Sequence, residues 1–235
     1  MTQNSTNKVQ PAHRQSGIDI GPRQAMKQHD IVVLSDLHLG EGRLGESDRF
    51  SPMEDFFYDE PFARLLQNLQ ERYHEDPSKL VLVLNGDVFD FLTVTCIPTR
   101  QELAQLDFDI SQSERRFGLN ATPKKSLWKF ERILEGHPVF FQAMAAFLRA
   151  GHRIEVIRGN HDLELFFTEI HERFREHLAS VDGGPSLEEA RRRLRFHQWF
   201  YFEPARLYIE HGNQYEASNS IRYPLRPLLP EGKSR

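Results

Sequence analysis

The sequence has little cysteine and no long apolar run, and both absences exclude classes of protein. A single cysteine, Cys96, excludes an intramolecular disulfide framework and an all-thiolate metal site. No uncharged apolar run approaches the roughly 20 residues needed to span a bilayer, and residues 1–30 lack the apolar core of a secretory signal. We therefore expect a cytoplasmic protein without a transmembrane segment.

The charge balance gives no reason to expect a polyanionic partner. Thirty Lys and Arg residues stand against 34 Asp and Glu residues, which leaves a net charge of −4. A chain of this charge has no general attraction to nucleic acids or anionic membranes, so we expect no stable nucleic-acid complex. The oligomeric state stays open.

The composition is that of a globular protein, with 39% hydrophobic and 11% aromatic residues in 235. Residues 1–29 are polar and lack helical or strand periodicity, so we interpret them as a flexible tail. Residues 30–221 form the expected domain, in which 93–130 has no strong period and is interpreted as an insertion or lid. Residues 222–235 resemble a linker.

Local patterns predict an α/β fold. Short apolar runs bounded by turn residues are typical of strands buried on both faces, and helical spacing of apolar residues predicts helices packed over them. The predicted strands are 31–34, 80–84 and 154–157. The predicted helices cover 62–73, 140–148, with Gly151 as C-cap, and 186–194, which a capping box opens. Residues 196–203 and 206–210 are predicted to form a hairpin. This order favours a mixed sheet with helices over it.

Polar side chains follow each predicted buried strand and the hairpin. They are Asp36 and His38, then Asp87 and Asp90, then Asn160, His161 and Asp162, and finally His211. Each cluster alone is compatible with an ordinary turn, an Asx turn or a structural histidine. Ligands of open α/β sheets bind outside the carboxyl ends of the strands, so the joint occurrence predicts one shared crevice. Imidazole and carboxylate together suit divalent metal ions.

Four sequence blocks carry a family resemblance. They are D-x-H at 36–38, G-D-x-x-D at 86–90, G-N-H-D at 159–162 and the His-Gly pair at 211–212. In this order they resemble the calcineurin-like metallophosphoesterase superfamily, over roughly residues 31–220. The sequence segments SDLHLG and GDVFDF are also similar to those of the UDP-2,3-diacylglucosamine hydrolases. A further block of that superfamily, G-H-x-H, has no counterpart because no histidine follows His211, so we expect a truncated domain.

The resemblance implies a four-layer α-β-β-α sandwich, with two sheets flanked by helices, and a dinuclear metal centre. Asp36 and His38 would hold the first ion, Asp87 would bridge both, and Asn160 and His211 would contact the second. We expect two divalent ions, Mn²⁺ in the first place, with Fe, Zn or Co as alternatives.

The resemblance also implies catalytic and substrate-binding roles. His161 would face the substrate and protonate the leaving oxygen, Asp90 would orient His161, and Asn160 and His161 would contact the substrate. Arg158 is a further substrate-contact candidate because it directly precedes the G-N-H-D block. Phe91 and Asp162 stand where protein phosphatases of the superfamily carry Arg and Glu, which argues against that substrate class.

The sequence thus predicts a metal-dependent phosphoesterase that hydrolyses a phosphomonoester or phosphodiester. The alternative is a truncated, non-catalytic remnant that acts as a metal- or ligand-binding module. A Rossmann-type nucleotide-binding domain is excluded because Ser35-Asp36 stands where a glycine-rich loop would follow the first strand.

Overall fold

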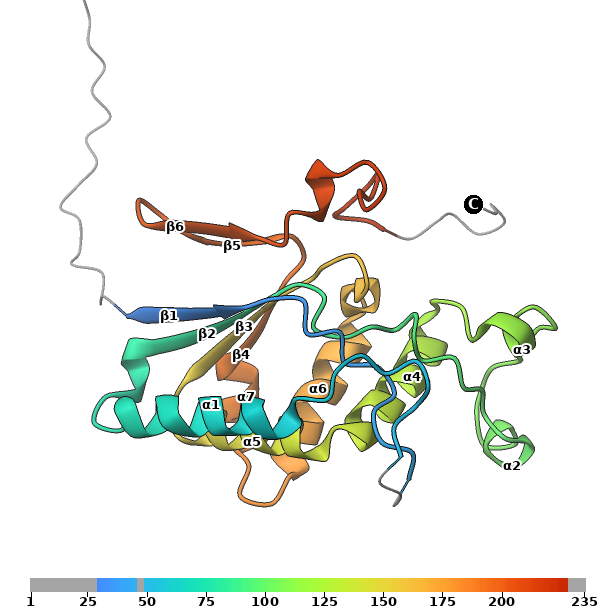
Figure 1. Ribbon diagram of the computed structural model, residues 1–235, viewed down its shortest axis with the longest axis horizontal. Helices are drawn as coiled ribbons and strands as arrows, with labels where there is room; N and C mark the ends of the chain where they lie inside the picture. Colours follow the sequence, from blue (N-terminus) through green and yellow to red (C-terminus); the bar gives the residue numbers. More distant parts are fainter. Residues whose placement is uncertain (1–28, 46–48, 228–235) are drawn as a thin grey trace, which may run out of the picture.

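A four-stranded parallel sheet forms the centre of the molecule (Figure 1). The computed structural model describes residues 29–45 and 49–227, so the tail expected over 1–29 lies outside the described residues except for His29. The strands are β1 (Asp30–Leu34), β2 (Leu80–Asn85), β3 (Arg153–Ile157) and β4 (Leu194–His197), paired in that order. The first three confirm the strands predicted from apolar runs. Residues Leu80–Leu84 of β2 are buried on both faces, as such a run requires.

The five longer helices lie on one side of this sheet (Figure 1). They are α1 (Asp59–Arg72), α4 (Pro123–Gly136), α5 (Pro138–Arg149), α6 (Thr168–Ser180) and α7 (Leu187–Arg193). Helix α4 lies beyond the strand ends and against α6 (Figure 1). The predicted capping box is present, because Ser186 and Glu189 each bind the other's backbone N–H. Helix α5 ends at Arg149 with Ala150 as its C-cap, so the predicted C-cap Gly151, which takes a φ of +106°, lies one residue beyond the actual one. The short helices are α2 (Arg100–Leu103), α3 (Glu114–Phe117), η1 (Pro77–Lys79), η2 (Leu163–Phe166) and η3 (Asn213–Tyr215).

An antiparallel hairpin of β5 (Phe200–Glu203) and β6 (Leu207–Glu210) covers the opposite face of the parallel sheet (Figure 1). Tyr201 and Ile209 pack against Val81, Val83 and Ile157. The prediction of one hairpin strand over 196–203 was wrong. Residues 194–197 pair with β3 instead, and a bend at 198–199 separates them from β5.

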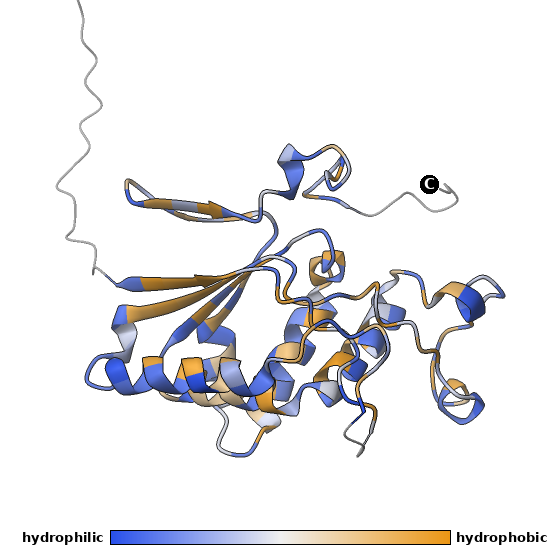
Figure 2. Ribbon diagram, viewed as in Figure 1, coloured by the Kyte–Doolittle hydropathy of each residue, from blue (hydrophilic) through white to orange (hydrophobic). Residues whose placement is uncertain are grey.

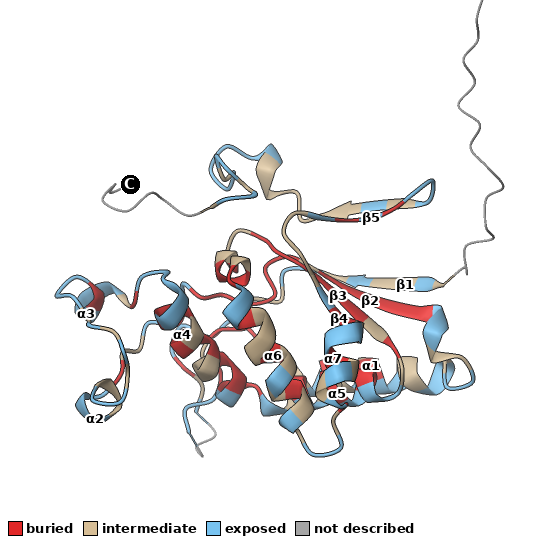
Figure 3. Cartoon of the chain, turned by 180° about the vertical axis from the view of Figure 1, so that it is seen from behind, coloured by how far each residue is buried: buried red, intermediate tan, exposed pale blue. Residues whose placement is uncertain are grey.

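The fold is therefore the expected mixed α/β type, in which a parallel and an antiparallel sheet are stacked and flanked by helices. Apolar residues gather along the parallel sheet (Figure 2), and the buried residues follow β2, β3 and the sheet-facing sides of the helices (Figure 3). Alternation along β2 sends Leu82 and Leu84 to the helices and Val81 and Val83 to the hairpin. Within the described ranges, no helix combines the length and apolar character of a membrane span.

The segment 93–130 is a folded part of the structure. It contains α2, α3 and the first half of α4. Buried Glu114 organises it, because its carboxylate accepts hydrogen bonds from Lys125 Nζ at 2.5 Å and from the backbone N–H groups of Ser111 and Asn120. A role as a lid stays a prediction.

A buried ionic cluster joins the loop after β1 to the α4–α5 junction. His137 is fully buried, with Nδ1 3.1 Å from Asp59 and Nε2 3.4 Å from Glu54. Glu54 also accepts the backbone N–H groups of Gly40 and Gly42. Burial alone would lower the pKa of His137, but the hydrogen bonds and charges of the two carboxylates outweigh it and raise that pKa.

Candidate metal centre

The loops that follow β1, β2 and β3 meet at one edge of the parallel sheet. His38 N–H donates to the Asp87 carbonyl at 2.9 Å, and Asp90 N–H donates to the Leu39 carbonyl at 2.8 Å, so the first two loops continue to run side by side beyond their strands. His211 reaches the same place from the end of β6, where its Nδ1 lies 3.0 Å from the Asn85 carbonyl. The predicted convergence of the strand ends is therefore present in the structure.

The backbone at this edge is strained. Asp36, His38 and Asp87 have φ values of +56°, +55° and +49°, and they are three of the four non-glycine residues with positive φ in the described part of the chain. This left-handed conformation costs an L-residue roughly 1–2 kcal/mol. Such strain persists only where the surrounding structure over-determines it, and it is concentrated at functional sites.

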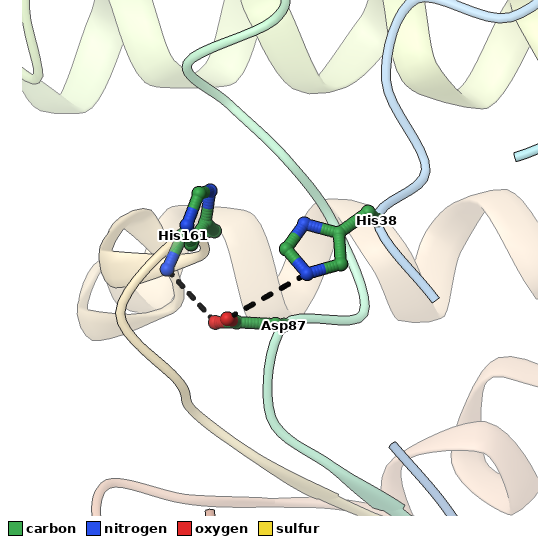
Figure 4. Close-up of side chains that lie close together, drawn as sticks. All are labelled: His38, Asp87 and His161. Carbon is green, nitrogen blue, oxygen red and sulfur yellow. Dashed lines mark hydrogen bonds and ion pairs between the residues drawn. The ribbon is translucent and has the colours of Figure 1, made fainter. Parts of the chain in front are cut away.

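The buried carboxylate of Asp87 is the centre of the cluster (Figure 4). Its Oδ2 lies 3.1 Å from His211 Nε2 and 3.8 Å from His38 Nε2, and its Oδ1 accepts the backbone N–H of His161 at 2.8 Å. Burial favours a lower pKa for His211, but the hydrogen bond and charge of Asp87 prevail and raise that pKa to about 9. Burial alone would raise the pKa of Asp87, but the hydrogen bonds from His211 and from the His161 N–H prevail and lower that pKa. The site thus attracts positive charge.

Two groups of side chains at this site have metal-ligand geometry. One group is His38, Asp87 and His161, and the other is Asp36, Asp87 and His211; the ligand atoms within each lie within 4.8 Å of one another. Two imidazoles or one imidazole with carboxylates suit borderline divalent ions. The donor set therefore fits the expected metals, and Asp87 is the one residue common to both groups.

The grouping differs from the one that the resemblance implied. Asp36 and His38, expected on the same ion, fall in different groups, and His161, expected to face the substrate, lies close enough to His38 and Asp87 to act as a ligand. Asn160 lines the adjoining cavity together with His161. Its assignment as a ligand stays a prediction.

Asp90 and His161 lie in the arrangement expected of an orienting carboxylate and an imidazole. His161 Nδ1 is 2.9 Å from Asp90 Oδ2, while Asp90 Oδ1 accepts the backbone N–H groups of Leu92 and Thr93. The His161 side chain is 34% exposed and its Nε2 has no hydrogen-bond partner among the described residues. An imidazole held at Nδ1 with Nε2 accessible can exchange a proton with a bound molecule.

Asp162 has a supporting function that we did not predict. Its side chain is fully buried, and its carboxylate accepts the backbone N–H of Val88 at 2.9 Å and that of Gly159 at 2.6 Å. Burial and the nearby charge of Asp87 raise its pKa to about 7. A side chain at Gly159 would place a Cβ 2.1 Å from Asp87 Oδ1. Asp162 and Gly159 together hold the loops after β2 and β3 in contact, and the Asx-turn pattern of 160–162 was the only sequence signal for this.

Arg158 does not point into the crevice. It is 5% exposed, and its guanidinium donates to Gln198 Oε1 at 2.9 Å and to the Pro224 carbonyl. The residue belongs to neither cavity beside the cluster. Two nitrogens of its guanidinium bind the protein, while the buried Nε has no hydrogen-bond partner among the described residues. Its assignment as a substrate contact stays a prediction.

Two cavities adjoin the cluster. The first, of about 430 Å³, is lined by Asn160, His161 and residues of the segment 218–227. The second, of about 390 Å³, is lined by Asp36, His38, Asp90 and His161 together with Asp55, Phe56 and Tyr58. Neither 55–58 nor 218–227 carries a sequence pattern that indicates a site, and both reach it through long-range packing.

Comparison with known proteins identifies a family. The family model described as calcineurin-like phosphoesterase matches residues 29–231. No curated protein and no solved structure gave a significant match to the chain.

Proposed function

The chain belongs to the calcineurin-like phosphoesterase family, and on this premise we propose that it hydrolyses a phosphomonoester or phosphodiester at a dinuclear metal centre. The observation that carries the proposal is that Asp87 belongs to both metal-competent groups. Two neighbouring cations need a shared carboxylate to screen their repulsion, and a buried carboxylate with histidines on both sides supplies one.

Asp36, His38, Asp87, Asn160 and His211 would hold the two ions, with Mn²⁺ in the first place and Fe, Zn or Co as alternatives. Divalent ions there would neutralise phosphoryl oxygens and acidify a bound water. Histidine and carboxylate ligands accommodate all of these metals.

The chain's own residues would orient the substrate and move a proton. His161 would hold a proton at Nε2 and give it to the leaving oxygen, because its Nδ1 is fixed by Asp90 at 2.9 Å. The loops carrying these two residues are joined by the Phe91 N–H, which donates to the His161 carbonyl at 3.4 Å, and buried Lys129 donates to the Phe91 carbonyl at 2.8 Å. These contacts keep the side chains of Asp90 and His161 next to each other.

The test is hydrolysis of bis-p-nitrophenyl phosphate and p-nitrophenyl phosphate, with bound metal counted on the same sample. We expect activity that EDTA abolishes and Mn²⁺ restores, and the ratio of the two rates narrows the ester class. Asp182→Asn, at an exposed turn, should behave as the wild type. Absence of hydrolysis with one ion or fewer per chain would reject the enzyme and favour a metal- or ligand-binding module.

A further inference from the structure

The segment 218–227 forms one wall of the cavity beside Asn160 and His161. Although the sequence resembles a linker from residue 222 onward, its described part folds back against the body of the protein. The cavity is of a size suited to a small organic molecule, so the residues that line it with His161 select which substituents can accompany a phosphate ester.

Three side chains outside the segment hold its backbone in place. Arg158 donates to the Pro224 carbonyl, Asn213 Nδ2 donates to the Asn219 carbonyl at 3.0 Å, and Gln214 Oε1 accepts the Ile221 N–H at 3.1 Å. Arg158 is buried, and such a charge is costly unless its donors are used. Its bond to Pro224 therefore links the strand-end loop that carries His161 directly to the cavity wall.

The wall presents two arginine side chains that form no ion pair within the described part of the chain. Arg222 and Arg226 both line the cavity and are exposed. Within the described residues neither has a carboxylate at ion-pair distance, and none of the cavity's lining residues is acidic. By contrast, Arg173 is paired with Glu131. Unpaired guanidinium groups facing a cavity are suited to bind phosphate or carboxylate.

Apolar and aromatic groups complete the cavity. Leu92 and Tyr223 are 65% and 62% exposed, and both line it together with Ile221. The guanidinium carbon of Arg222 lies 5.4 Å from the centroid of the Tyr223 ring, so this ring also positions the arginine. Exposed side chains of this kind favour a flat or apolar moiety that can cover them. The lining thus combines apolar contact with positive charge next to the Asp90–His161 pair.

Building on the proposed function, we propose that the segment 218–227 recognises the part of the substrate beyond the scissile phosphate, and that this part carries a second anionic group, a phosphate or carboxylate, on an organic moiety. Arg222 and Arg226 bind the second anion. Arg158 is a positioning residue that acts through Pro224.

The test compares two chromogenic diesters that differ by one phosphate: thymidine 5′-(p-nitrophenyl phosphate) and its 3′-phosphorylated form. With the Mn²⁺-loaded full chain, we expect kcat/KM to be about tenfold higher for the 3′-phosphorylated ester, the lower end of what charge-assisted contacts contribute, since the arginines are exposed. The double variant Arg222→Gln/Arg226→Gln should bring this ratio close to one, and added salt should lower it in the wild type. Arg192→Gln, at an exposed position on α7, should retain the ratio.

The outcomes separate the inference from the proposed function. Hydrolysis of both esters with equal efficiency by the wild type, or an unchanged ratio in the double variant, would overturn the inference alone. Hydrolysis of neither ester by the metal-loaded wild type would reject the proposed function and the inference with it. For Arg158, the variant Arg158→Lys keeps the charge but loses the second donor, so the ratio should fall at unchanged metal content; a wild-type ratio would refute the positioning role.

Discussion

Replacement of His161 distinguishes an acid from a metal ligand. The imidazole lies in hydrogen-bond contact with Asp90 and also within ligand distance of His38 and Asp87. If it protonates the leaving oxygen, His161→Gln should lower kcat by about 10²–10⁴-fold, equivalent to about 2.7–5.5 kcal/mol in the barrier, and both ions should stay bound. The exposed His74→Gln should match the wild type.

Asp90→Asn should have a smaller effect for a reason that the contacts supply. The amide oxygen can still accept the N–H groups of Leu92 and Thr93, so the loop is kept, but the charged partner of His161 is lost. One charge-assisted hydrogen bond contributes about 1.5–3 kcal/mol, which corresponds to a loss of roughly 10- to 150-fold in kcat. The double variant should be no slower than His161→Gln alone, because both substitutions remove one function.

The assay measures kcat on bis-p-nitrophenyl phosphate and on diphenyl phosphate, with metal counted in each sample. Phenolate leaves less readily than p-nitrophenolate, so loss of a general acid should slow the diphenyl ester more. Loss of one ion in His161→Gln would place the residue among the ligands. Equal deficits on both esters, or additive losses in the double variant, would refute the reasoning.

The remaining predictions concern metal content and stability. Asp87→Asn should release both ions and abolish hydrolysis, because both groups share this carboxylate; a full metal complement would contradict a bridging role. Gly159→Ala should lower the free energy of unfolding by about 3 kcal/mol, since its Cβ would meet the Asp87 backbone N at 2.5 Å. Gly183→Ala has open space around its Cβ and should lower it by only about 1 kcal/mol, because its backbone is left-handed. Equal losses of the two variants in urea titrations would contradict this. Because the pKa of His137 is raised in the folded protein, its contribution to stability is fully present below pH 6.5, the ordinary pKa of histidine, and is lost as the pH rises. The difference in the free energy of unfolding between wild type and His137→Gln should therefore shrink above pH 6.5. A difference that grows in urea titrations from about pH 5 to 9 would refute this direction.

The parallel sheet and the convergence of its strand ends could be predicted because their signals are local. The continuous apolar run 80–84 indicates a strand that is buried on both faces, and turn residues mark where each strand ends. Once three such strands are placed in parallel, their carboxyl ends must meet, which brings Asp36, Asp87 and His161 together without further information.

The parts that failed depend on partners distant in sequence. Residues 196–203 read as one aromatic strand, yet Phe196 pairs with Val156 of β3 and Phe200 pairs with Glu210 of β6. Strand registers are fixed by the neighbour rather than by the strand itself. The assignment of ligands to individual ions stays a prediction, and the grouping in the structure differs from it because side-chain directions depend on the left-handed backbone at Asp36 and His38.

The location of Arg158 shows the same limit at the level of one side chain. An arginine next to the G-N-H-D block is equally compatible with substrate contact and with support. The outcome was decided by Gln198 and Pro224, which lie 40 and 66 residues away in the chain. No periodicity or motif in the sequence connects these positions.

The left-handed backbone at Asp36, His38 and Asp87 has a consequence for attempts to engineer this protein. Glycine at any of the three positions would relieve roughly 1 kcal/mol of strain, but it would also delete a candidate metal ligand. A directed-evolution screen that rewards heat resistance alone would therefore accept substitutions that remove the proposed activity. A selection for thermostable variants must therefore also require hydrolysis of a substrate, or it will return variants that are stable but inactive.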